Sequence, residues 1–169
     1  MKNSVLGKFL VAFFVGSFIT YSQDSTKLQI SIQTQFMYHP SDFFWSIGTS
    51  IHQHKLSYNI DLGLGVRSTF FQNQLTPRIS YNFGYAIRLS KLFIIQPELR
   101  ASYFFQRIRI LQNTLLLQEI ESFLAGKIFL GNKHAVFIVG GVGPAWSFNN
   151  KSSFFHWSYF SEIGYRYVF

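Results

Sequence analysis

Cysteine is absent from this 169-residue sequence, and charged residues and proline are scarce. Without cysteine the chain can form neither disulfide bonds nor thiolate metal sites. Charged residues make up only 13% of the chain, whereas a soluble domain usually carries about 25%. Four prolines and 12 glycines are too few for a disordered or collagen-like tract. These absences indicate a folded chain whose exterior faces something other than water.

Aromatic side chains and positive charge are what the sequence has in excess. Hydrophobic residues make up 48% of the chain and aromatic residues 20%, with 21 Phe among them. Lys and Arg number 15 against seven Asp and Glu, a formal net charge of +8. Such a balance is compatible with nucleic acid, an anionic membrane surface or no specific partner. The chain is too short for two domains, so one domain must account for these properties.

The first 22 residues are predicted to be a cleaved signal peptide. Lys2 and Lys8 give a basic start, and residues 9–19 form an unbroken apolar run. That run is too short for a membrane-spanning helix, which needs about 20 residues, but it fits the apolar core of a signal peptide. A short anchor helix is the alternative. Export of the chain argues against a nucleic-acid partner, and the mature domain is expected to comprise residues 23–169.

Apolar and polar side chains alternate with a period of two from residue 28 onward, which is the pattern of a β-strand with one apolar and one polar face. In the clearest stretch, residues 56–67, Ile60 and Leu62 alternate with Asp61. Strands of this length can cross a membrane, which takes about 9–11 residues. The sequence predicts eight of them, at residues 28–38, 43–52, 56–67, 79–89, 93–107, 115–130, 135–148 and 155–169.

The bulk of the apolar faces decides which side of the strands points outward. The interior of an eight-stranded barrel is only just wide enough to be filled by side chains. It cannot hold eight faces crowded with Phe, Tyr and Trp, so these faces must lie outside. We therefore predict an all-β fold, an eight-stranded antiparallel up-and-down transmembrane β-barrel with a polar lumen. The alternative is a soluble lipocalin-like barrel, which would need its apolar face inside.

Charged residues on the predicted inner faces are expected to form ion pairs that close the lumen. Acids and bases balance there, as a confined interior requires, because an unpaired buried charge is costly. The alternative to this static plug is a small pore for ions or small solutes. The predicted network consists of the acids Asp61, Glu98, Glu119, Glu121 and Glu162 and the bases Arg67, Arg88, Arg100, Lys127 and Arg166.

The leader, the alternating strands and the aromatic C-terminus resemble the small outer-membrane β-barrels of Gram-negative bacteria, of the OmpX and OmpA-domain type, and more loosely the PorT-like barrels. Gly164, Tyr167 and Phe169 are similar to the C-terminal insertion signal of that family. The resemblance implies an outer-membrane location and recognition of the last strand by the barrel-assembly machinery. It also implies a structural or interaction role: envelope integrity, adhesion, or docking of an envelope or secretion complex with other envelope proteins.

The ends of the predicted barrel carry the remaining positive charge. An even number of strands places both mature termini on one side, which is expected to be the periplasm. One rim is predicted to hold Lys27, Lys55, Lys91 and Lys133. The outer rim is predicted to contact the phosphates of lipopolysaccharide through Arg78, Arg107, Arg109 and Lys151. Belts of Trp and Tyr at the lipid interfaces are expected from Trp45, Trp146, Trp157, Tyr159, Tyr165 and Tyr167.

His156, Ser158 and Glu162 share one face of the last strand and provide the candidate catalytic residues. A His–Ser pair oriented by a carboxylate is the arrangement of a hydrolase, and outer-membrane lipid A deacylases are similar in carrying such residues on an eight-stranded barrel. Strand parity, however, places these residues inside, away from lipid. We therefore expect them to be polar filling with no catalytic role, and a lipid A-modifying hydrolase is the alternative.

The histidines are scattered along the sequence and predict no metal site. His52 and His54 share strand parity, but they lie at a predicted turn with no carboxylate nearby. No glycine-rich phosphate loop is present either, because Gly140, Gly141 and Gly143 lie within a predicted strand. We therefore expect neither a metal nor any other cofactor.

Overall fold

The computed structural model describes residues 28–66, 76–110, 113–149 and 152–169, and the side chains of all of these except 107–110 and 113–115. The predicted signal peptide lies outside the described residues. Within the described ranges, no helix is long and apolar enough to cross a membrane.

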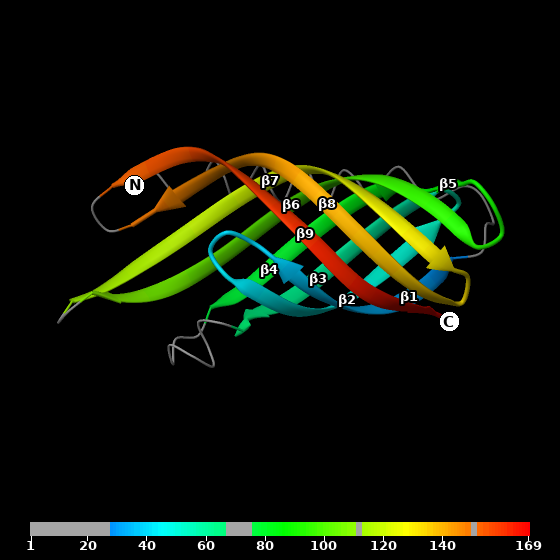
Figure 1. The fold of residues 1–169 in the computed structure, drawn as a ribbon, viewed down its shortest axis with the longest axis horizontal. Coiled ribbons are helices and arrows are strands. Elements are labelled where there is room, and N and C mark those ends of the chain that lie inside the picture. The colour runs from blue at the N-terminus through cyan, green and yellow to red at the C-terminus, as the bar shows by residue number, and fades with distance from the viewer. Residues whose placement is uncertain (1–27, 67–75, 111–112, 150–151) are drawn as a thin grey trace.

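Strands make up almost the whole of the described chain and form one antiparallel sheet that closes into a barrel (Figure 1). In order they are β1 (Gln29–Tyr38), β2 (Phe43–Gln53), β3 (Leu56–Gly65), β4 (Pro77–Tyr85), β5 (Ile87–Arg88), β6 (Phe93–Ile110), β7 (Asn113–Gly131), β8 (His134–Phe148) and β9 (Ser153–Val168). Strands that follow one another in sequence are paired, except that β4 pairs with β6 and not with β5, and β1 also pairs with β9.

The break between β4 and β5 makes one interrupted strand out of two segments. Both segments pair with β6, and Ala86 lies between them. Because β4 and β5 together occupy one strand position, the nine segments form eight strands of the barrel wall. This confirms the predicted eight-stranded up-and-down barrel. At the break the backbone N–H of Ala86 donates to the carbonyl of Lys55 at 2.6 Å, so pairing with the β2–β3 turn replaces the missing ladder bond.

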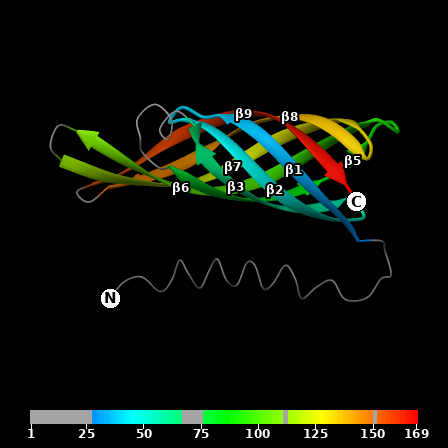
Figure 2. The ribbon, with the colours of Figure 1, turned by 90° about the horizontal axis from the view of Figure 1, so that it is seen from below.

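Both ends of the described chain lie at one end of the barrel, which we call the terminus end (Figure 2). The backbone N–H of Phe169 donates to the carbonyl of Ile30 at 3.0 Å, which ties the last residue to the first strand. The three connections at this end are short. His54 and Gly131 have φ values of 54° and 123°, in the left-handed region that tight hairpin turns use.

The β6–β7 hairpin projects at the opposite end, which we call the far end (Figure 2). Its two strands stay paired as far as Ile110 and Asn113. The described pairing of β6 with β4 stops at Phe104, and that of β7 with β8 stops at Gln118. The tip of this hairpin therefore extends past the neighbouring strands to which the rest of the hairpin is bonded.

Alternate residues along the strands are buried in the barrel or exposed on its outside, which confirms the predicted orientation. Asp61 is 1% exposed, whereas its neighbours Ile60 and Leu62 are 42% and 63% exposed. In a soluble barrel the order would be reversed, with the apolar side chains inside. The aromatic side chains predicted to form the interfacial belts are also on the outside. Tyr167 is half-buried, and the exposed ones are Trp45, Trp146, Trp157, Tyr159 and Tyr165.

Phenylalanine rings also fill the lumen, where we expected small and polar side chains. The buried rings are those of Phe44, Phe104, Phe123, Phe129, Phe137 and Phe160. Glycines on the inner faces provide the space for them. A Cβ atom at Gly141 would run into the Phe160 ring, and one at Gly164 would run into the Phe137 ring. The interior therefore sets large rings against glycines, as close packing of a narrow barrel requires.

Candidate functional site in the barrel lumen

The centre of the lumen is occupied by an arginine held between two glutamates. Arg100 on β6 donates from Nη2 to Oε1 of Glu98 at 2.9 Å and from Nη1 to Oε2 of Glu162 on β9. Its guanidinium carbon lies 4.4 Å from the centroid of the Phe160 ring. All three charged side chains are buried. This arrangement is a compact plug of one base and two acids, in which hydrogen bonds and a cation–π contact replace water.

Asp61 is held by amide groups instead of by a base. Its Oδ1 accepts from Nε2 of Gln33 at 2.9 Å, and its Oδ2 accepts from Nδ2 of Asn59 at 2.8 Å and of Asn82 at 2.7 Å. The predicted network considered charged residues alone and missed these amides. Parity could have found them, because Gln33, Asn59 and Asn82 share the inner faces of their strands with the predicted acids.

Lys127 and Arg166 fill the part of the lumen nearer the terminus end and lie over aromatic rings. Nζ of Lys127 is 4.0 Å from the centroid of Phe137, and Cζ of Arg166 is 3.8 Å from that of Phe129. Lys127 also donates to Oε1 of Gln33 at 3.2 Å. These two bases are buried as predicted, but ring faces are their close neighbours, where we expected carboxylates.

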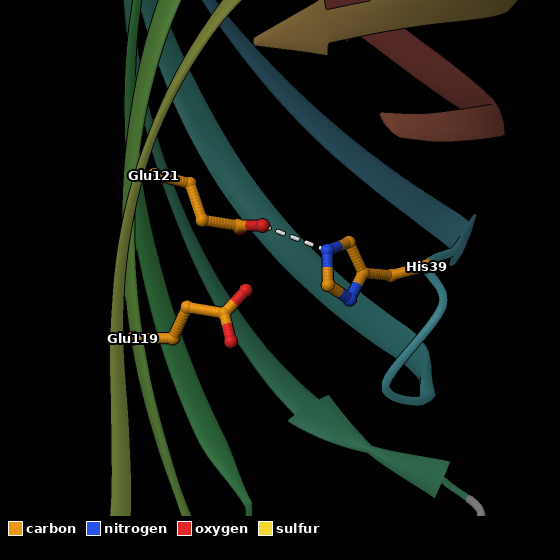
Figure 3. Close-up of side chains that lie close together, drawn as sticks. All are labelled: His39, Glu119 and Glu121. Atoms are coloured by element: carbon orange, nitrogen blue, oxygen red, sulfur yellow. Dashed lines mark hydrogen bonds and ion pairs between the residues drawn. The ribbon is translucent and has the colours of Figure 1, made fainter. Parts of the chain in front are cut away.

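A cluster of His39, Glu119, Glu121 and Ser158 lies nearer the far end (Figure 3 shows the first three). His39 directly follows β1, Glu119 and Glu121 are on the inner face of β7, and Ser158 is on that of β9. Nε2 of His39 is 2.7 Å from Oε1 of Glu121 and 2.8 Å from Oγ of Ser158. Phe104 contacts the imidazole edge to face, with the ring centroids 5.5 Å apart.

Small residues on β8 make room for this cluster. Glu121 is paired with Ala145, and Ala145 is paired with His156, so β8 places only a methyl group between the two larger side chains. Glu119 accepts from Oγ of Ser147 at 2.7 Å, and its other carboxylate oxygen lies 3.5 Å from Nε2 of His156. Residues that are far apart in sequence thus meet in one compartment.

Most of the predicted network is in the lumen. Arg88 is the exception, because it is exposed. It belongs to the short β5, which pairs with β6 past the last pairing of β3 with β4, so it lies at the rim of the barrel. Arg67 lies outside the described residues. The residues found buried as predicted are Asp61, Glu98, Arg100, Glu119, Glu121, Lys127, Glu162 and Arg166.

The prediction that Arg78 lies on the rim that contacts lipopolysaccharide is wrong. It is buried at 3% exposure, and its Nη2 donates to Oγ of Ser102 at 2.6 Å inside the barrel. The alternation of β4 begins at Pro77, earlier than predicted, and this places Arg78 on the same inner face as Ser80 and Asn82. The other predicted rim residues, Arg107, Arg109 and Lys151, lie outside the described side chains.

The residues of the alternative hydrolase hypothesis have separate partners. Ser158 contacts His39, Glu162 pairs with Arg100, and His156 approaches Glu119. His39 and Ser158 form a second His–Ser pair, with His39 at the end of β1 and Ser158 on β9. The backbone N–H of Ser41 donates to Nδ1 of His39 at 3.2 Å, so the neutral ring carries its proton on Nε2. That proton is donated to Oε1 of Glu121, so Nε2 is not free to accept the hydroxyl proton of Ser158.

No known family model matches the sequence, and no curated protein sequence matches it significantly. Solved structures share the fold. The N-terminal β-barrel domain of OprF from Pseudomonas aeruginosa is similar with a TM-score of 0.62 and 5% identity, covering 86% of this chain and 100% of that one. A major outer membrane protein from Thermus thermophilus gives a TM-score of 0.58 with 9% identity, covering 85% and 100%.

Neisserial surface protein A is similar with a TM-score of 0.55 and 10% identity, covering 86% of this chain and 100% of that one. At these identities the likeness concerns the fold. The molecule is thus an eight-stranded antiparallel β-barrel of the outer-membrane type, with an apolar exterior and a filled lumen.

Proposed function

We propose that this chain is an integral outer-membrane protein with a structural or interaction role and a closed lumen. The observation that supports it is the combination of an apolar exterior with an interior filled along its length. Leu62, Leu124 and Ile163 are more than half exposed, whereas every carboxylate side chain of the described residues is buried. Burying such apolar surface in lipid is favourable by about 25 cal/mol per Å². In water, the whole apolar exterior would lose this stabilisation.

The filled lumen favours a structural role over a pore. Arg100 and its two glutamates cross the centre, and the rings of Phe129 and Phe137 lie between them and the terminus end together with Lys127 and Arg166. Eight-stranded barrels have room for side chains and little else. An open ion path would require these pairs and rings to move apart together. The proposal therefore assigns the barrel a role on its surface and no catalytic or conducting role.

We place the terminus end in the periplasm. Its connections are tight turns, and such barrels have short periplasmic turns and longer outer loops. In this orientation Gly164, Tyr167 and Phe169, at the end of β9, would be offered to the barrel-assembly machinery during insertion. The projecting β6–β7 hairpin would face the cell exterior, where it offers strand edges for adhesion or docking.

The two rims supply candidate lipid contacts. Exposed bases gather at the terminus end, and two of them lie over tyrosine rings: Lys55 over the exposed Tyr85 at 5.8 Å and Lys133 over the half-buried Tyr167 at 5.4 Å. This is the amphipathic arrangement of residues that anchor a protein at a membrane interface. Contact with lipopolysaccharide at the far end would rest on Arg107, Arg109 and Lys151.

Fractionation of expressing cells tests the location, and planar bilayer recording tests the closed lumen. We expect the chain in the outer-membrane fraction, with a band that migrates differently in unboiled and boiled gel samples. Recovery in the soluble periplasm without such a band would overturn the membrane assignment. Purified barrel should add negligible conductance to a planar bilayer, and steady single-channel steps would favour the pore instead. A mass change of lipid A upon expression would reveal a hydrolase.

A further inference from the structure

We propose that the far compartment of the lumen binds one divalent transition-metal ion, best matched by Zn²⁺, through His39, Glu119 and Glu121, with His156 as a fourth ligand. The site is independent of the proposed membrane role, since it requires only the closed barrel. It is a binding site that the sequence did not indicate, because its ligands are distributed over three separate elements.

The positions of the ligand atoms fit a metal centre. One nitrogen of His39 and one carboxylate oxygen each of Glu119 and Glu121 all lie within 4.8 Å of one another. Figure 3 shows the two glutamates from β7 and the imidazole from the opposite wall converging on one space. Zinc binds nitrogen and oxygen at about 2.0–2.2 Å, which sets neighbouring ligand atoms about 3.3 Å apart in a tetrahedron. Ligation would require side-chain rotations that bring the atoms from this spacing to that one.

Unsatisfied oxygens point to a missing ligand. Oε2 of Glu121 and Oε1 of Glu119 have no hydrogen-bond partner, although these residues are 0% and 2% exposed. The ion-pair partner of Glu119 Oε1 is Nε2 of His156 at 3.5 Å, which is too long for a hydrogen bond. A buried carboxylate oxygen without a donor is costly. A bound cation would satisfy both oxygens at once.

The charge of the compartment also suits a divalent cation. Glu119 and Glu121 bring two negative charges, and each has a histidine as its ion-pair partner. Arg78 is a nearby base whose charge also acts on Glu121, and its described hydrogen bond is to Oγ of Ser102. Asp42, which is also buried, is an acid and does not oppose a cation. Two carboxylates and two imidazoles form a neutral set with Zn²⁺, and imidazole together with carboxylate is a donor set that zinc uses.

The metal would take the place of a proton. In the described arrangement Nε2–H of His39 holds Glu121 at 2.7 Å, which is closer than two ligands of one metal would stand. A metal on Nε2 moves the ring proton to Nδ1 and displaces the Ser41 N–H, which can turn to water because Ser41 lies in a partly exposed turn. His156 has a 36% exposed side chain, so the compartment can be reached from the far end.

Cobalt substitution and calorimetry on the tag-free full chain, purified in detergent, test this site. We expect one Zn²⁺ per barrel, and Co²⁺ at the same site should show the visible absorption of a tetrahedral centre. His39→Ala and Glu121→Gln should each weaken Zn²⁺ binding by more than about tenfold. His54→Asn removes an exposed histidine at the opposite end, tolerates the left-handed backbone there, and should bind as the parent does.

Three results would overturn the proposal. They are no saturable Zn²⁺ binding, Zn²⁺ binding that survives both ligand substitutions, or an equal loss of Zn²⁺ binding in His54→Asn, which would show that surface histidines bind the metal. Heat-modifiable migration of each variant shows that it is folded. If one ligand variant fails to fold, Glu119→Gln provides the same comparison, because Glu119 is held by Ser147 on the neighbouring strand. Binding in a barrel found outside the membrane would leave the site intact while contradicting the proposed location.

Discussion

Arg100 and Glu162 form an ion pair across the lumen, between strands that are not neighbours in the sheet. Arg100 is on β6 and Glu162 on β9, with β7 and β8 between them in the strand order. Glu98, two residues before Arg100 on β6, holds the second nitrogen of the guanidinium. The pair therefore ties opposite walls of the barrel together, in addition to the backbone ladder that closes it.

Breaking this pair should destabilise the barrel strongly. Removal of one partner from a buried ion pair costs about 3–5 kcal/mol, because the remaining charge loses its compensation. We expect Glu162→Gln to lower the free energy of unfolding in urea, and Arg100→Met to lower it further, since that change leaves two glutamates without their base. Lys91→Ala, at an exposed rim position, is the control. Equal stability of all three variants would contradict the role given to the pair.

A charge on the outer face should distinguish lipid from water as the surrounding medium. Leu62 is 63% exposed and lies between Ile47 and Ile79 on adjacent strands. Leu62→Arg should destabilise the barrel folded in vesicles by about 2–4 kcal/mol if this position lies near the bilayer midplane. Leu89→Arg, in the exposed β5–β6 connection, should cost about 0–1 kcal/mol. Similar unfolding energies for both would place Leu62 in water.

Two glycines on β8 should respond differently to the addition of a methyl group. A Cβ atom at Gly143 would meet the backbone carbonyl of Ser122 on β7, whereas one at Gly140 would meet nothing within 4 Å. Gly143→Ala should therefore cost about 1–3 kcal/mol, because a strand must shift. Gly140→Ala should be neutral or slightly stabilising. The temperature at which the folded gel band disappears measures the stability of both variants. A lower temperature for Gly140→Ala than for Gly143→Ala would contradict this packing around β8.

The C-terminal aromatic residue should matter for assembly more than for stability. Phe169 is 66% exposed and contacts Tyr167 edge to face, with the ring centroids 5.0 Å apart. If it is part of an insertion signal, Phe169→Ala should reduce the amount of folded barrel in cells while purified chain refolds in detergent as before. Phe154→Ala changes an exposed aromatic side chain near the far end of the same strand and serves as the control. Equal cellular yields of the two variants would argue against the signal.

The strands and their orientation could be predicted because both depend on local, repeating properties. Successive side chains of a strand point to opposite faces, so a run such as Ile60, Asp61 and Leu62 reveals its two environments without knowledge of the partners. The same parity predicts that Glu98, Arg100 and Glu162 lie in the lumen, where all three are buried. Parity does not, however, say how far each strand continues, which is why Arg78 was predicted at the rim and Arg88 in the lumen.

The partners inside the barrel depend on closure, which no local pattern contains. His39 and Glu121 are 82 residues apart in sequence, and they meet because pairing of β1 with β9 and of β4 with β6 curves the sheet until its inner faces oppose each other. The register of β8 against β9 likewise sets Gly141 beside Phe160, which makes room for an aromatic ring inside. Alternation along the chain thus determines which medium each side chain faces. The stagger and curvature of the closed sheet determine which inward side chains touch.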